Sequence, residues 1–132
     1  MTARRRGTKR AKKLPGPDHP ITIEPNTTRV RVTFNGRIVA DSRRALRLKE
    51  ASYPAVFYIP REDADQALIE KTATSTHCPY KGDASYYSIK TDDKTAADAI
   101  WSYETPFPAM KEITGYLAFY PKRVDSITEE PA

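Results

Sequence analysis

The segment from His77 to Gly82 holds the residues best suited to covalent or acid–base chemistry. It contains the chain's only cysteine, Cys78, and places Lys81 three residues later. A nearby ammonium group favours the thiolate form of a cysteine, so Cys78 could act as a nucleophile that Lys81 activates. The alternative is a small packed side chain, because free cysteine is among the most buried residue types. The sequence leaves both interpretations open.

Tyrosines form the second concentration of functional side chains. All eight lie at or beyond Tyr53, and the later part of the chain also carries Trp101. A buried tyrosine must place its hydroxyl against a polar partner, so a sheet rich in tyrosine often opens one face to a pocket. We therefore predict an aromatic pocket bordered by Arg61, Lys81 and Asp41 and suited to a small planar, polar or anionic ligand. Close packing between sheets would explain the same residues equally well. The expected lining residues are Tyr58, Trp101, Tyr103 and Tyr120.

Metal, nucleotide and hydrolase sites lack the residues they need. One cysteine and two histidines are too few for a disulfide framework or a thiolate-rich zinc site within the chain. The five glycines are scattered, so the chain contains neither a phosphate-binding loop nor a dinucleotide fingerprint. We expect no metal and no cofactor.

The elements that must position these residues are mainly strands. Apolar and polar residues alternate over 29–34, as on a strand with one buried face. Asn35 and Gly36 then indicate a tight hairpin turn into a second strand over 37–41. One helix of about ten residues is expected from Pro60, because acidic residues fill its first turn and a lysine ends it. Further strands are predicted over 45–49, 55–59, 84–89, 99–103 and 115–120, and loops over 72–83 and 91–94.

Length and charge indicate one domain with a basic N-terminal arm. The chain has 132 residues, of which 39% are apolar and 30% charged. Residues 1–20 are predicted to be a disordered arm, 21–127 a single β-rich domain and 128–132 a short tail. Seven basic residues lie in the first thirteen; without them, 15 basic residues face 17 acidic ones. The arm could make weak, nonspecific contact with nucleic acid, or serve only solubility.

The sequence shows no targeting segment and no membrane span. The mean hydropathy is −0.67, and no stretch approaches the roughly 18 continuous apolar residues that a membrane helix requires. No apolar segment follows the basic N-terminus, so a signal peptide is not expected. We expect a soluble, cytoplasmic protein.

Five ordered motifs lie between about residue 29 and residue 125. They are Asn35-Gly36 with Val39-Ala40-Asp41, the segment from Tyr58 to Asp63, the segment from Cys78 to Tyr86, Trp101-Ser102-Tyr103, and the segment from Gly115 to Pro121. Together these motifs resemble domain-of-unknown-function family 427. The resemblance implies a β-tent-like fold, in which small antiparallel sheets lean together, with one short helix. Related β-tent proteins often hold zinc on two CxxC pairs, and this chain has neither pair. The family also carries a nucleotidyltransferase-like label, for which the sequence supplies no acidic metal-binding pair.

Three hypotheses of function follow. The first is a small-ligand-binding β domain, with the aromatic residues as lining and with Lys81 and Arg61 orienting a polar or anionic group. The second is an enzyme in which Cys78 or Lys81 acts covalently or as acid or base, with Tyr58 as proton donor. The third is a structural or interaction module that uses a sheet edge and the basic arm. The sequence identifies neither a ligand nor a reaction.

Overall fold

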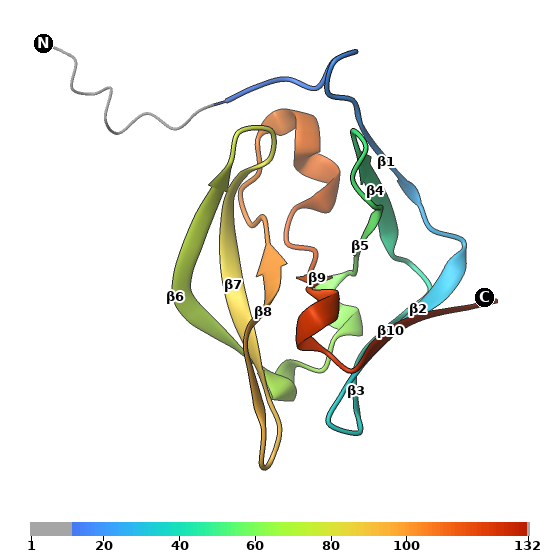
Figure 1. Ribbon diagram of the computed structural model, residues 1–132, viewed down its shortest axis with the longest axis vertical. Helices are drawn as coiled ribbons and strands as arrows, with labels where there is room; N and C mark the ends of the chain where they lie inside the picture. The colour runs from blue at the N-terminus through green and yellow to red at the C-terminus, as the bar shows by residue number, and fades with distance from the viewer. Residues whose placement is uncertain (1–11, 132) are drawn as a thin grey trace, which may run out of the picture.

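A computed structural model describes residues 12–131, and strands dominate it (Figure 1). The predicted fold class, mainly β with small antiparallel sheets packed together, is confirmed. Within the described range there are three sheets. The first sheet has the order β1 (Ile21–Pro25), β4 (Leu46–Glu50), β5 (Val56–Tyr58); the second has the order β10 (Ser126–Pro131), β2 (Thr28–Phe34), β3 (Arg37–Ser42). The third has the order β6 (Ile69–Cys78), β7 (Gly82–Lys90), β8 (Thr95–Ser102), β9 (Ala118–Phe119).

The β2–β3 hairpin forms as its sequence predicts. Val30, Val32 and Phe34 are buried on one face of β2, as the alternating pattern requires. Asn35 and Gly36 both have positive φ, 50° and 74°, which is the backbone of the tight turn that this residue pair favours. The predicted loop over 91–94 is also present, closed by a hydrogen bond from the Thr91 amide to the Lys94 carbonyl at 2.9 Å.

The sheets lean against one another and are joined near their middle. Figure 1 shows the third sheet on the left and the first sheet on the right, with β9 between them. Ile59, just after β5, and Leu117, just before β9, exchange two backbone hydrogen bonds, each 2.8 Å long. Both side chains are fully buried. This bridge therefore ties two sheets together inside the core.

The structure replaces the expected helix by two 3-10 turns. These are η1 (Arg61–Asp63) and η2 (Gln66–Leu68). Ala64 lies between them in an extended conformation, with φ −105° and ψ 150°, which interrupts any continuous helix. The Asp65 carboxylate then accepts a hydrogen bond from the Ala67 amide at 3.1 Å and starts the second turn. Two more 3-10 segments are η3 (Pro108–Ile113) and η4 (Pro121–Arg123).

Three strands occur where the sequence analysis expected none. Strand β6 occupies most of the expected loop over 72–83, and β1 precedes the first predicted strand. Residues 128–131, expected to be a tail, belong to β10 and pair with β2. Residues 12–20, expected to be part of a disordered arm, contact the domain: the Lys13 amide donates to the Pro79 carbonyl at 2.7 Å. Residues 1–11, and with them most of the predicted basic arm, lie outside the described residues.

No helix in residues 12–131 has the length and apolar character needed to cross a bilayer.

Replacing Ile59 by alanine should strongly destabilise the fold. Its side chain is fully buried at the bridge between two sheets, and such truncations cost about 2–5 kcal/mol of unfolding free energy. Urea denaturation measures the loss. The matched control is Ile38→Ala, because Ile38 is 51% exposed and its loss should cost under about 1 kcal/mol. Equal effects of the two substitutions would contradict the described core.

Candidate functional site

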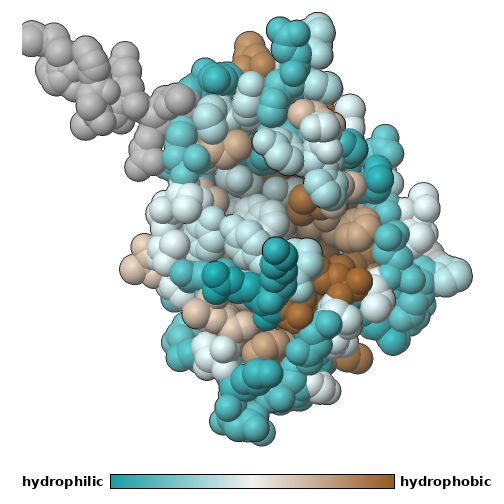
Figure 2. Space-filling view, in the orientation of Figure 1, coloured by the Kyte–Doolittle hydropathy of each residue, from teal (hydrophilic) through white to brown (hydrophobic). Residues whose placement is uncertain are grey.

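A cavity of about 280 Å³ lies where the first and third sheets meet. β4, β5 and the loop between them form one wall, and β7, β8 and the residues that follow β8 and β9 form the other. Figure 2 shows the molecule hollowed near the centre of one face, between these two sheets. A volume of this size is at the lower end of the range for small-molecule sites. The lining residues are Leu48, Glu50, Tyr53, Pro54, Val56, Tyr58, Lys81, Tyr86, Trp101, Tyr103 and Tyr120.

Strand alternation places the aromatic rings on the cavity side of the third sheet. Tyr86 on β7 lies directly opposite Trp101 on β8, and Tyr103, two residues further on, lines the same cavity. Tyr87 points the other way and packs in a different core cluster from Tyr86, as the sequence predicts for neighbouring residues of a strand.

Trp101 is the centre of the aromatic lining. Its ring centroid lies 4.4 Å from that of Tyr120 and 6.3 Å from that of Tyr58, with the Tyr58 ring nearly perpendicular to it. The Trp101 indole N–H donates to the Tyr58 hydroxyl at 3.2 Å. Burial raises the pKa of both Tyr58 and Tyr103, so both phenols stay protonated through the neutral range.

A buried ion pair forms the polar end of the cavity. The Lys81 ammonium lies 2.5 Å from Glu50 Oε1, and the two side chains are 8% and 17% exposed. His19 contacts the other carboxylate oxygen at 2.7 Å. Burial of the Glu50 carboxyl raises its pKa, but the hydrogen bonds from Lys81 and His19 outweigh that effect, so the pKa lies below its ordinary value. Lys81 also lies 3.5 Å from the Cys78 sulfur.

The structure brings together five of the predicted site residues. Tyr58, Lys81, Trp101, Tyr103 and Tyr120 all line the cavity. Cys78 is next to it through its contact with Lys81 and packs against the same core cluster.

Glu50, a cavity-lining residue that the sequence analysis missed, joins this set. Its partner Lys81 is 31 residues away along the chain, so no local spacing pattern could reveal the pair.

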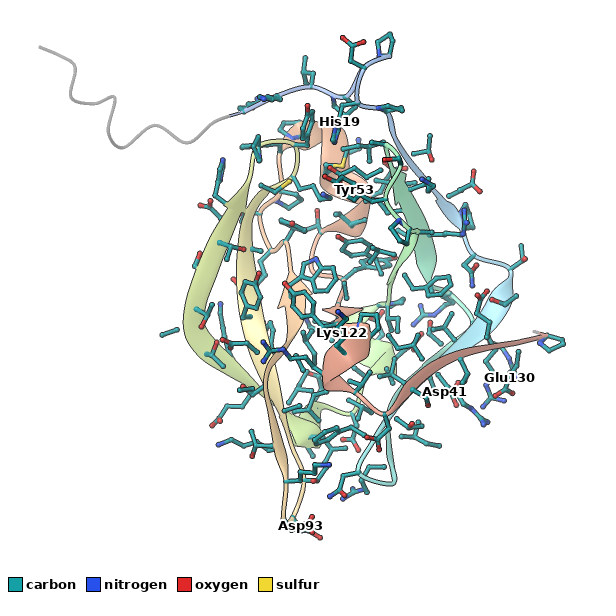
Figure 3. The ribbon with its side chains drawn as sticks, in the orientation of Figure 1. His19, Asp41, Tyr53, Asp93, Lys122 and Glu130 are labelled. Carbon is teal, nitrogen blue, oxygen red and sulfur yellow. The ribbon has the colours of Figure 1, made fainter. Side chains whose placement is uncertain are left out.

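Arg61 and Asp41 are not among the lining residues. The Arg61 guanidinium donates to the Tyr87 hydroxyl at 3.1 Å, on the opposite face of the third sheet from Trp101. Asp41 accepts two hydrogen bonds from Arg29, at 2.7 and 2.6 Å, on the β2–β3 hairpin. Figure 3 places Asp41 beside Glu130, far from Tyr53 at the cavity. Arg61 also pairs with Glu104 at 3.4 Å, so both residues belong to ion pairs outside the cavity lining.

A second polar network surrounds Glu104 on the face of the third sheet that carries Tyr87, opposite the cavity. Its carboxylate accepts hydrogen bonds from Lys71 at 2.8 Å, from Ser85 at 3.0 Å, and from the Tyr87 hydroxyl. Burial raises the pKa of Glu104, but these hydrogen bonds outweigh it and lower the pKa to about 2. This network stabilises the ionised form of the carboxylate.

A second cavity of about 300 Å³, with a largely apolar lining, shares Val56 and Trp101 with the first. Among residues 12–131, no group of three or more histidine, cysteine or acidic side chains is placed to hold a metal ion.

The fold and the cavity define a small mainly β domain with an aromatic site at the junction of two sheets. The model of the family described as a domain of unknown function (DUF427) matches residues 22–130. The chain belongs to this family, which confirms the resemblance drawn from its motifs. No curated protein matches the chain.

The Glu104 network should make stability depend on acidic pH. Because the folded-state pKa is about 2 and the ordinary value 4.5, the contribution is full above about pH 4.5 and is lost as the pH falls toward 2. Urea denaturation from pH 6 to pH 2 should show a steeper loss for the wild type than for Glu104→Gln, with the two curves converging at the acidic end. Glu62→Gln is the control, since that side chain is 70% exposed, and it should follow the wild type. A Glu104→Gln curve parallel to the wild type would disprove this role.

Proposed function

We propose that this domain binds a small planar ligand in the cavity between the first and third sheets, with a polar group of the ligand facing Lys81 and Glu50. The observation that carries the proposal is the arrangement of six aromatic side chains and a buried ion pair around one open cavity. Sites for small molecules usually combine an apolar, aromatic lining with a few convergent polar groups. The cavity has both parts.

The aromatic geometry supports a planar occupant. Tyr86 and Tyr120 are stacked within 12° of parallel and join through their hydroxyls at 3.1 Å, which holds both rings in place. Tyr58 is held by the indole of Trp101. Rings fixed in this way lose little conformational freedom when a ligand binds, and their faces favour other flat π systems.

The polar end supports recognition of a defined group. Lys81 belongs to the segment from His77 to Gly82, which the sequence indicates as the most suitable for chemistry. Its side chain is almost completely buried. A hydrogen bond to a charged group contributes about 1.5–3 kcal/mol. A ligand that reaches Lys81 or Glu50 would therefore be oriented as well as bound.

Binding should be visible in the fluorescence of Trp101. It is the only tryptophan and lines the cavity, so a metabolite screen can be followed by its emission and by the melting temperature. A ligand at 100 times its Kd should stabilise the folded protein by about 2.7 kcal/mol.

Lys81→Met should weaken such a ligand about tenfold or more, because the cavity loses both a charge-assisted contact and the ion pair that positions Glu50. Lys90→Met is the matched control at the far end of β7, where Lys90 pairs with Glu70 and is 54% exposed. Circular dichroism checks that both variants fold. A broad library without a hit would favour the interaction-module hypothesis, and equal losses in the two variants would place the ligand elsewhere.

One observation favours a second candidate function, an enzyme with Cys78 as nucleophile. The Lys81 ammonium lies 3.5 Å from the Cys78 sulfur, so a cation stands beside the thiol. The same ammonium, however, is engaged more closely by Glu50 at 2.5 Å. This competition makes ligand binding the better supported function.

Alkylation by iodoacetamide separates the two candidates. We expect native Cys78 to react several-fold more slowly than in urea, because it is partly buried against the core cluster that contains Tyr58 and Tyr86. Mass spectrometry of timed samples gives both rates. Faster reaction in the native protein, reduced in Lys81→Met, would support the enzyme instead.

A further inference from the structure

The hydroxyl of Tyr103 is buried beside the cavity without a hydrogen-bond partner. Tyr103 is 7% exposed and lines the cavity, and no residue of the described chain hydrogen-bonds to its side chain. The other buried tyrosines differ: the Tyr86 hydroxyl bonds to Thr76 at 2.9 Å and to Tyr120 at 3.1 Å. Buried hydroxyls in proteins are almost always paired, so this one leaves a hydrogen-bond donor available to whatever occupies the cavity.

Tyr58 supplies a second unmatched donor. Its side chain is 1% exposed, and its oxygen accepts the hydrogen bond from the Trp101 indole. The indole N–H can only donate, so the phenolic proton of Tyr58 has no acceptor among residues 12–131. Two O–H donors that lack acceptors therefore line one cavity.

The charges at the cavity are already matched. Lys81 is the one cation among the lining residues of the described chain, and Glu50 lies 2.5 Å from it. Glu50 is also held by His19. An anionic ligand would meet the Glu50 carboxylate without a spare positive charge, and a cationic ligand would have to displace Lys81. The groups at the cavity that lack partners are therefore hydroxyl donors, which need hydrogen-bond acceptors, and not charged side chains.

We propose that the ligand is an uncharged, planar molecule whose carbonyl-type acceptor takes hydrogen bonds from the Tyr103 and Tyr58 hydroxyls while its ring packs on Trp101. This inference rests on the proposed function and narrows its ligand class. It replaces the anionic option by a neutral acceptor, because donors without acceptors, and no free cation, face the cavity.

Four single-ring probes of similar size test the ligand class. Acetophenone is the neutral acceptor, ethylbenzene lacks the acceptor, benzoate is an anion and benzylamine is a cation at neutral pH. Binding is followed by Trp101 emission and by amide chemical shifts. Acetophenone should bind about tenfold more tightly than each of the others, the ratio expected from one buried hydrogen bond. Tyr103→Phe should remove this advantage and leave ethylbenzene unchanged.

A measurement without any probe tests the unpaired hydroxyl itself. Tyr103→Phe should maintain or raise the melting temperature, because it removes a buried polar atom that lacks a partner. Tyr86→Phe is the matched control and should lower the melting temperature, because that hydroxyl is paired twice.

The outcomes are distinct. Tighter binding of benzoate or benzylamine than of acetophenone would overturn the neutral class while supporting a ligand site. Failure of all four probes, or a loss of stability in Tyr103→Phe equal to that in Tyr86→Phe, would overturn the inference. The proposed function would then still be judged by the metabolite screen.

Discussion

The ion pair between Lys81 and Glu50 is the constraint on which the cavity depends. Taking two charges out of water costs several kcal/mol per ion, and that cost is tolerated only when each charge keeps its partner. The pair joins β4 to the turn that precedes β7, so it fixes the distance between the two walls. Lys81 also accepts a backbone hydrogen bond from Phe107 at 2.9 Å, which brings the start of η3 to the same place. Gly82 permits this turn, because its φ of 112° is a backbone conformation that residues with a side chain rarely adopt.

A second joint holds the same walls at another point. Ile59 and Leu117 exchange two backbone hydrogen bonds where β5 ends and β9 is about to begin. The ion pair holds the two sheets together at one point and the backbone hydrogen bonds hold them at another. The aromatic side chains between these points therefore need not fill the space to keep the sheets in place. Their partners are chiefly one another: Trp101 with Tyr58, and Tyr86 with Tyr120. An open, ring-lined cavity is therefore compatible with a stable core on both sides of it.

The sequence predicts the parts of this fold that follow from local rules. Asn35 and Gly36 specify the β2–β3 turn by their tolerance of positive φ, and alternation separates Tyr86 from Tyr87. Strand β6 was missed because its polar, mostly exposed residues show no apolar alternation, and only pairing with β7 makes it a strand. The segment after Pro60 has the charge order of a helix, yet the extended Ala64 divides it into two turns. There, tertiary contacts outweigh local preference, as the isolated bridge from Ala40 to Ala64 indicates.

In the candidate site, too, some features follow from local sequence rules and others depend on contacts between distant residues. Ring-bearing residues could be assigned to one face from their spacing, whereas charge partners depend on a register that no local pattern contains. Arg61, Asp41 and Lys81 all looked like available charges in the sequence. In the structure Arg61 serves the Glu104 network, Asp41 binds Arg29, and Lys81 binds Glu50. Once these pairs are formed, the charges near the cavity are neutralised within the fold. The hydrogen-bonding capacity that remains belongs to two buried phenols that line the cavity, Tyr103 and Tyr58, whose hydroxyls have no acceptor in the described chain. Under the proposed function, selectivity would therefore depend on the hydroxyl donors and the ring faces, while the basic residues hold the fold in place.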